Sequence, residues 1–254
     1  MNKTAIKNYA VEARKKWIQA IAQQAAFYGC TKNGSLSEAE VTKQLADKGV
    51  FLSEDEKNAR RDLVKEISSK GYQNTIEEVA YTWFNRMIAI RFMEVKEYLP
   101  SGIRVLSSQD AGRIEPDCIR EYARLDFINQ ETAAKFAAES DEKLYRYILV
   151  EQCNALGKIM PKMFTHIGGI AALLLPERLY IKDGLVYDLT HSISEEDFGE
   201  QVEIIGWLYQ YYISEKKDEV FAALKKNVKI TRENIPAATQ LFTPDWIVKY
   251  MVEN

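Results

Sequence analysis

The residue spacing most suggestive of catalysis is Glu94-Val95-Lys96, which matches the Glu-x-Lys half of a metal-dependent nuclease site. In such sites, carboxylates from neighbouring strands converge on a divalent metal ion that activates the attacking water. Here the triplet lies within a stretch whose apolar residues recur at helical spacing. We therefore interpret Glu94 and Lys96 as helix residues rather than as parts of a nuclease site.

Histidine and glycine patterns give little support to a metal centre or a phosphate site. The two histidines, His166 and His191, have no cysteine nearby and lack the His-x3-His spacing, which favours structural or surface roles. No Gly-x-Gly-x-x-Gly or Gly-x-x-x-x-Gly-Lys-Ser/Thr motif is present. Gly168-Gly169 is more typical of a loop or a close helix contact than of a ligand site. We predict no catalytic residue and no metal ligand in this chain.

The composition indicates a globular protein of a reducing compartment. Hydrophobic residues make up 46% of the chain and charged residues 28%, which are ordinary values for a protein that buries a core. The three cysteines are odd in number and widely separated, so we predict a cytoplasmic location without a disulfide framework. The longest purely apolar run, residues 170–175, is too short to cross a membrane.

An aromatic-rich segment could stack on nucleic-acid bases, as such side chains do in proteins that bind single strands. The segment contains Trp207, Tyr209, Tyr211 and Tyr212. Aromatic residues at this spacing are more often buried on one face of a helix than exposed to a ligand. We therefore favour a core position for them.

Two basic pairs could contact DNA phosphates, although solvated helix faces are their commoner setting. The pairs are Lys15 with Lys16, and Arg60 with Arg61. Residues 1–99 carry 16 Lys and Arg against 13 Asp and Glu, a net charge of +3, whereas residues 100–254 carry 18 against 24, a net charge of −6. Nucleic-acid modules usually show a stronger basic excess. Any DNA contact by this chain is thus expected to be auxiliary.

The elements that position these residues are predicted to be helices. The first spans about residues 4–27. Three capping boxes, in which a hydroxyl and a glutamate satisfy free N–H groups of a first turn, predict further helix starts. They are Ser37 with Glu40, Ser53 with Glu56, and Thr75 with Glu78. The third box opens the strongest helix, residues 76–99, whose apolar residues recur at spacings of 3, 4 and 7 before Pro100.

The second half is predicted to contain shorter helices and one hairpin. Helices are expected at 116–124, 130–138, 141–156, from 194 through 213, and at 218–226. Asp183-Gly184 between two apolar pairs is a hairpin signal. The fold class is therefore mainly α, a multi-helix bundle with at most one small β-hairpin near 179–187. We divide it into an N-terminal helical bundle at 1–100, a second helical subdomain at 115–228, and a connector at 229–254.

Residues 238–252, near the end of the chain, are the most informative segment about function. Thr243 is a favourable N-cap, Pro244 suits the first helical position, and Asp245 complements the helix dipole. An apolar stripe follows: Trp246, Ile247, Tyr250 and Met251. An ordinary terminal helix would show the same features.

The pattern Thr-Gln-x-Phe-Thr-Pro, followed by an aromatic-Ile-Val helix, resembles motif X, which opens the catalytic domain of many adenine-specific DNA methyltransferases. Segments 80–108 and 203–221 resemble the helical N-terminal region of PglX-like methyltransferases of BREX phage-defence systems, so the resemblance covers essentially the whole chain. It implies contact with the methionine end of S-adenosylmethionine, in the intact enzyme only, for Leu241, Phe242, Thr243 and Pro244. Free N–H groups at a helix start suit such a carboxylate.

The chain departs from these enzymes in lacking the D-P-x-x-G-x-G cofactor motif and the N-P-P-Y/F motif that holds a flipped adenine. The resemblance thus implies a non-catalytic region, without bound cofactor of its own, that ends at the first helix of an absent class I methyltransferase domain. It would support that domain, contact DNA or dock other phage-defence proteins. The alternative is a stand-alone helical adaptor that binds proteins.

Overall fold

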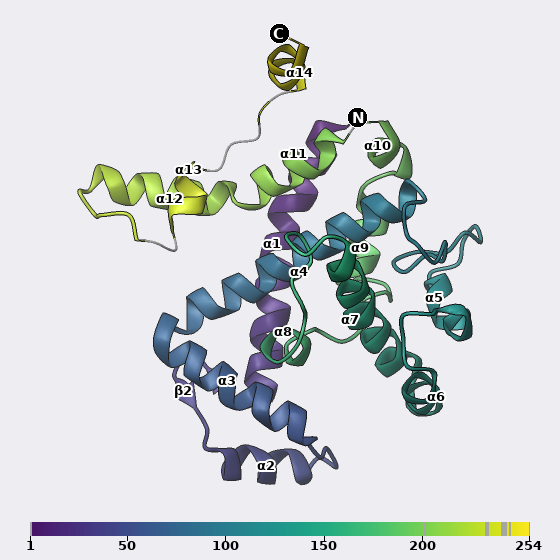
Figure 1. Cartoon of the computed structure of the whole chain (residues 1–254). Helices are drawn as coiled ribbons and strands as arrows, with labels where there is room; N and C mark the ends of the chain where they lie inside the picture. Colours follow the sequence, from purple (N-terminus) through teal and green to yellow (C-terminus); the bar gives the residue numbers. More distant parts are fainter. Residues whose placement is uncertain (1, 201, 232–233, 240–242, 244, 254) are drawn as a thin grey trace.

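A computed structural model describes residues 2–200, 202–231, 234–239, 243 and 245–253, and these are mainly helical (Figure 1). In chain order the elements are α1 (Lys3–Phe27), β1 (Cys30–Thr31), β2 (Gly34–Ser35), α2 (Glu38–Ala46), α3 (Glu54–Lys70), α4 (Tyr72–Val95), α5 (Asp117–Arg120), η1 (Tyr122–Arg124), α6 (Gln130–Glu139), α7 (Asp141–Ile159), α8 (Ile170–Leu173), α9 (Leu185–Ser192), α10 (Glu195–Glu200), α11 (Glu203–Tyr212), α12 (Ser214–Lys225), α13 (Ile235–Thr239) and α14 (Asp245–Glu253). The predicted mainly α fold class is confirmed.

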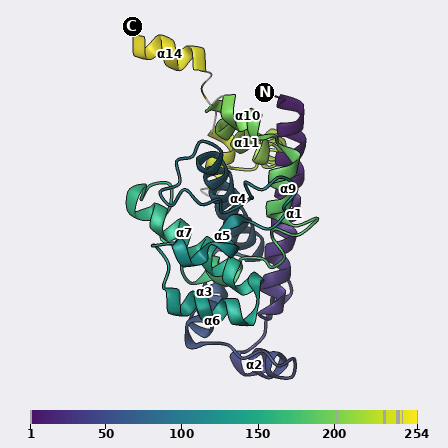
Figure 2. The same cartoon turned by 90° about the vertical axis from the view of Figure 1, so that its right-hand side faces the viewer.

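Helices α1 and α4 form the centre of the molecule. Both bury apolar side chains at helical spacing, and Trp17 of α1 and Trp83 of α4 are fully buried. Helix α1 packs against α4, α9 and α11, so segments far apart in the sequence lie side by side (Figures 1 and 2). One hydrophobic core, from Ile6 to Tyr212, is shared by helices on both sides of the predicted boundary at 100–115. The division into subdomains remains a prediction.

Two of the three predicted capping boxes are confirmed. The hydroxyls of Ser37 and Ser53 accept hydrogen bonds from the backbone N–H groups of Glu40 and Glu56, whose carboxylates accept in return from the serine N–H groups. They start α2 and α3.

The predicted bounds of the strongest helix, residues 76–99, are wrong at both ends. Helix α4 begins at Tyr72, and Thr75 lies inside it, where its hydroxyl donates to the carbonyl of Gly71 at 3.0 Å. Gly71, with φ of 85°, both ends α3 and directly precedes α4, so the helix begins three residues before Thr75 and Thr75 cannot be its N-cap. Helix α4 ends at Val95 because Glu97 adopts a left-handed conformation, with φ of 57°.

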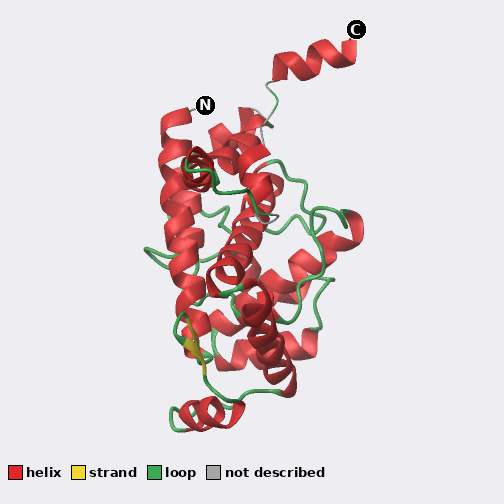
Figure 3. Cartoon of the chain, turned by 90° about the vertical axis from the view of Figure 1, so that its left-hand side faces the viewer, coloured by secondary structure: helices red, strands yellow, loops and turns green. Residues whose placement is uncertain are grey.

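The predicted position of the hairpin is also wrong, because the described strands are β1 and β2 (Figure 3). They pair antiparallel, with Cys30 opposite Ser35 and Thr31 opposite Gly34, around the two-residue turn Lys32-Asn33. At 179–187, Asp183 and Gly184 do form a turn, but α9 begins directly after it. As a helix, this segment buries Leu185, Val186 and Leu189 on one face. A strand of three residues would bury less apolar surface, so the helix is favoured.

Gly184→Ala should destabilise the protein because the turn before α9 has no room for a Cβ atom. An added Cβ would lie 2.2 Å from the carbonyl oxygen of Arg178 and 2.4 Å from that of Leu179. We expect the free energy of unfolding, measured by urea denaturation, to fall by about 1–3 kcal/mol. Gly199→Ala is the matched control, since its Cβ meets nothing within 4 Å. Equal midpoints for the two variants would contradict this account of the turn.

No helix in the described part of the chain is both long and apolar enough to cross a membrane. The long helix expected from residue 194 to 213 is instead divided into α10 and α11. Ser194 still caps the first of them, since its hydroxyl accepts a hydrogen bond from the N–H of Asp197 at 3.1 Å.

Candidate functional sites

The segment expected to contact a cofactor lies immediately before α14. Leu241, Phe242 and Pro244 lie outside the described residues, whereas Thr243 is described and exposed. The helix expected after them is present as α14. The cofactor role of the four residues remains a prediction.

Helix α14 presents an apolar surface that the other described helices leave uncovered. It lies apart from them in all three views (Figures 1–3). Trp246 is 71% exposed, Tyr250 66% and Met251 73%. Soluble proteins rarely leave such large apolar groups clustered in water unless a partner covers them. With nine residues, α14 is also shorter than the ~12–15 at which an isolated helix becomes marginal in water.

The arginine pair was considered as a phosphate contact, with a solvated helix face as the favoured interpretation; for Arg60 the favoured interpretation is wrong, because its side chain is buried. Arg60 is only 3% exposed, and its guanidinium donates hydrogen bonds to the carbonyls of Tyr28, at 2.8 Å, and Leu36, at 2.5 Å. Arg61 binds both carboxylate oxygens of Glu38, at 2.7 and 2.8 Å. Both arginines therefore connect α3 to the segment that precedes or forms α2.

The lysine pair is exposed in part, but each lysine has a carboxylate partner. Lys15 lies 3.3 Å from Glu215, and Lys16 donates to Asp188 at 2.6 Å. The hydrogen bond to Asp188 raises the pKa of Lys16. The structure does not bring this pair together with the arginines, because α1 and α3 hold them separately. A phosphate at either lysine would compete with the carboxylate already there.

Glu94 is a buried carboxylate whose two oxygens are both engaged. One oxygen accepts hydrogen bonds from the backbone N–H groups of Val105 and Leu106, at 2.6 and 2.7 Å. The other oxygen accepts hydrogen bonds from the hydroxyl of Ser107 and the guanidinium of Arg91, both at 2.7 Å. These donors occupy the positions that a metal ion would need. The structural interpretation of Glu94 is confirmed.

The same network continues to α10 through Glu195 and Arg104. Arg91 donates to Glu195 at 3.0 Å, and Arg104 forms a second ion pair with that carboxylate. Burial alone would raise the pKa of Glu195, but the hydrogen bond from Arg104 and the charges of both arginines outweigh it and lower the pKa. Lys96 donates to the carbonyl of Gly199, also on α10. The Glu94-x-Lys96 triplet therefore anchors a loop and a helix to α4.

The histidines make local contacts. His191 stacks on Tyr187 with 3.8 Å between ring centroids, and His166 is exposed. Among the described residues, no group of three His, Cys, Asp or Glu side chains is arranged to hold a metal ion.

Of the aromatic segment, Tyr212 belongs to the core, and Trp207 and Tyr211 are partly buried and pack against it. Tyr212 is buried against Phe84, with ring centroids 4.2 Å apart, so the core interpretation is confirmed for this residue. Trp207 and Tyr211 stack on each other at 5.8 Å and are half-buried, and the amine of Lys3 lies over Trp207 at 4.7 Å.

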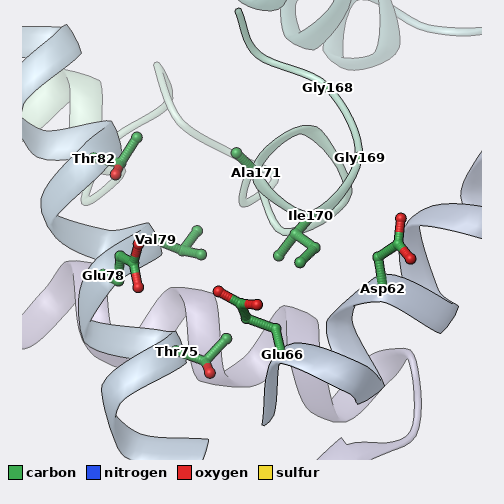
Figure 4. Close-up of a pocket in the computed structure, with 10 residues that line it drawn as sticks. All are labelled: Asp62, Glu66, Thr75, Glu78, Val79, Thr82, Gly168, Gly169, Ile170 and Ala171. Atoms are coloured by element: carbon green, nitrogen blue, oxygen red, sulfur yellow. The ribbon is translucent and has the colours of Figure 1, made fainter. Parts of the chain in front are cut away.

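A hollow of about 360 Å³ lies between α3, α4 and the segment before α8 (Figure 4). Glu66 and Glu78 are on its walls, and both bind Lys70, at 2.6 and 2.9 Å. Gly168-Gly169 forms the loop that lines its other side. Since one lysine joins both glutamates, this arrangement resembles a surface ion-pair network more than a pair of catalytic acids.

Comparison with known proteins identifies relatives of the whole chain. No protein-family model matches it. Over its full length, the chain is 40% identical to the adenine-specific methyltransferase PglX of Lacticaseibacillus casei (strain Zhang) and 41% identical to the adenine-specific methyltransferase BrxX of Escherichia coli O9:H4 (strain HS). It spans 23% and 21% of the lengths of these two relatives. The resemblance predicted from the sequence is therefore confirmed.

Proposed function

We propose that this chain, which is homologous over its full length to about a fifth of PglX and BrxX, is the helical N-terminal region of an adenine-specific DNA methyltransferase of a BREX-type phage-defence system. The observation that carries the proposal is identity of 40% and 41% in alignments that cover 100% of this chain. The reaction of the full-length enzyme would be methyl transfer from S-adenosylmethionine to the exocyclic amine of adenine in DNA.

The region would support the catalytic domain through α14. Its exposed Trp246, Tyr250 and Met251 offer an apolar surface that a following domain could cover. Covering such side chains is the main source of stability in domain contacts. The same surface would also suit a stand-alone adaptor, the alternative function, which a reading frame without a D-P-x-x-G-x-G motif after Asn254 would favour.

The cofactor would bind against the residues before α14. S-adenosylmethionine supplies the electrophilic methyl group. Thr243 is exposed next to the first turn of α14, and free N–H groups of a first helical turn suit the carboxylate of the methionine end. Leu241, Phe242 and Pro244 would flank that carboxylate.

The test is methylation of DNA by the full-length enzyme. Purified enzyme, host DNA and S-adenosylmethionine should yield N6-methyladenine, measured by mass spectrometry of the digested DNA. Thr243→Ala should raise the dissociation constant for S-adenosylmethionine, because it removes a hydroxyl at the helix start. Methylation of cytosine only, or none with a folded enzyme that binds the cofactor, would contradict the proposed function.

Hydrogen exchange should report whether α14 needs a covering domain. In a protein made of residues 1–254, we expect residues 245–253 to exchange faster than α4, because α14 is short and its apolar side chains are exposed. In the full-length enzyme the same amides should exchange more slowly. Equal protection of α14 and α4 in the monomeric short protein would show that α14 belongs to the helical body.

A further inference from the structure

Three lysines at the end of α12 and just after it form an exposed basic cluster: Lys225, Lys226 and Lys229. Residues 220–231 contain no carboxylate. None of the three lysines forms an ion pair with a described residue. The cluster thus differs from Lys15, Lys16 and Arg61, whose charges are each matched by a carboxylate.

The local structure explains how the cluster is presented. Only Val220 of the twelve residues of α12 is buried, and Figure 1 shows the helix extending away from α1 and α4. Asn227, with φ of 58°, ends the helix in a left-handed conformation and turns the chain back toward α13. The dipole of α12 favours lysines in its last turn, which accounts for Lys225 and Lys226. It does not account for Lys229, which lies beyond the helix.

We propose that Lys225, Lys226 and Lys229 bind the phosphate backbone of duplex DNA beside the adenine that the full-length enzyme methylates. This inference rests on the proposed function. Lysines without carboxylate partners are the point charges that neutralise phosphates, and each strand of duplex DNA carries one negative charge per about 3.4 Å of axis. Three such lysines could neutralise up to three phosphates.

The position of the cluster in the chain agrees with this partner. The lysines precede α13, which packs against α12, and α13 ends four residues before Thr243. Within the described residues, α13 is the helix between the basic cluster and Thr243 in the chain. An enzyme that extracts a base must hold the backbone near the site of methyl transfer. The apolar side chains of Val228 and Ile230 are also exposed beside the lysines. The competing partner to test is therefore a protein surface that offers both carboxylates and apolar side chains.

The experiment measures duplex binding by the full-length enzyme as a function of salt. In the triple variant Lys225→Gln, Lys226→Gln, Lys229→Gln, the slope of log affinity against log salt should be shallower by about 2.7, at about 0.9 per phosphate. Between 50 and 200 mM salt, wild-type affinity should therefore fall about 40-fold more than that of the variant. The methylated sequence should stay the same, because phosphate contacts carry no sequence information.

The control variant replaces three exposed lysines elsewhere by glutamine: Lys158, Lys162 and Lys182. It should keep the wild-type slope. A wild-type slope in the first variant would overturn the inference while leaving the proposed function intact, provided that the enzyme still methylates DNA. A lower melting temperature or a changed assembly state with an unchanged slope would also overturn it and assign the cluster to a protein contact. A wild-type enzyme that neither binds nor methylates DNA would refute the proposed function itself.

Discussion

A protein made of residues 1–254 alone should transfer no methyl group to DNA, whereas the full-length enzyme should do so under the same conditions. The 254 residues contain neither a D-P-x-x-G-x-G nor an N-P-P-Y/F sequence. Without them, most contacts to the cofactor and the groups that hold a flipped adenine are missing. Four residues before α14 cannot replace that site, because binding energy comes from many contacts held in a fixed geometry.

Two measurements separate this expectation from poor folding. Incorporation of labelled methyl groups into DNA should be at background for the short protein and readily detected for the full-length enzyme. Titration calorimetry with S-adenosylmethionine should give no heat change for the short protein at micromolar concentrations. A circular dichroism spectrum of a helical protein, with cooperative melting, serves as the control for folding. Micromolar binding by the short protein would mean that its residues form a cofactor site by themselves.

Glu94→Ala should lower the free energy of unfolding by about 3–5 kcal/mol, the range seen when one member of a buried ion pair is removed. The side chains of Glu94 and Arg91 are 0% and 2% exposed. The substitution leaves the guanidinium of Arg91 with fewer partners and deprives two buried backbone N–H groups, of Val105 and Leu106, of their acceptor. The loop after α4 should then lose its attachment.

Urea denaturation with two further variants tests the cause. Glu94→Gln keeps the side-chain volume but replaces one accepting oxygen by an NH2 group, which faces groups that are themselves hydrogen-bond donors. We therefore expect it to lower the free energy of unfolding by most of the amount seen with Glu94→Ala. Glu131→Ala is the matched control on α6, where an 80% exposed side chain pairs with Lys135. Its effect should stay within about 0.5 kcal/mol. If Glu94→Ala lowers the free energy of unfolding no more than Glu131→Ala does, the hydrogen bonds of Glu94 do not hold the loop after α4 in place.

Local sequence was sufficient for most of the helices. The buried residues of α4, which include Ile76, Val79, Trp83 and Met87, lie at the predicted spacings of 3 and 4. The boxes at Ser37 and Ser53 cap as expected, because their partners are three residues away. Homology to adenine-specific methyltransferases was also recognisable in the sequence, since long matched segments do not depend on the fold.

Predictions were wrong where the local sequence was compatible with two structures and packing against residues distant in the sequence selected one of them. Asp183-Gly184 is a turn in either a hairpin or a helix start, and the core beneath Leu185 and Leu189 selected the helix. At Gly71, α3 ends and α4 begins directly afterwards, so Thr75 lies inside the helix that it was predicted to cap. Neither outcome could be derived from a window of ten residues, because packing energy exceeds the few tenths of a kcal/mol that separate local propensities.

The sequence by itself determined the fold class, the relationship to methyltransferases and the N-cap signal before α14. Only the tertiary structure decided which charged residues are available to a partner. Arg60 is bound to a carbonyl 32 residues away, Arg91 to a carboxylate 104 residues away, and Lys16 to one 172 residues away, whereas Lys229 has no such partner among the described residues. The physical reason is that a charge is neutralised by whatever group the fold places within about 4 Å, irrespective of its separation along the chain.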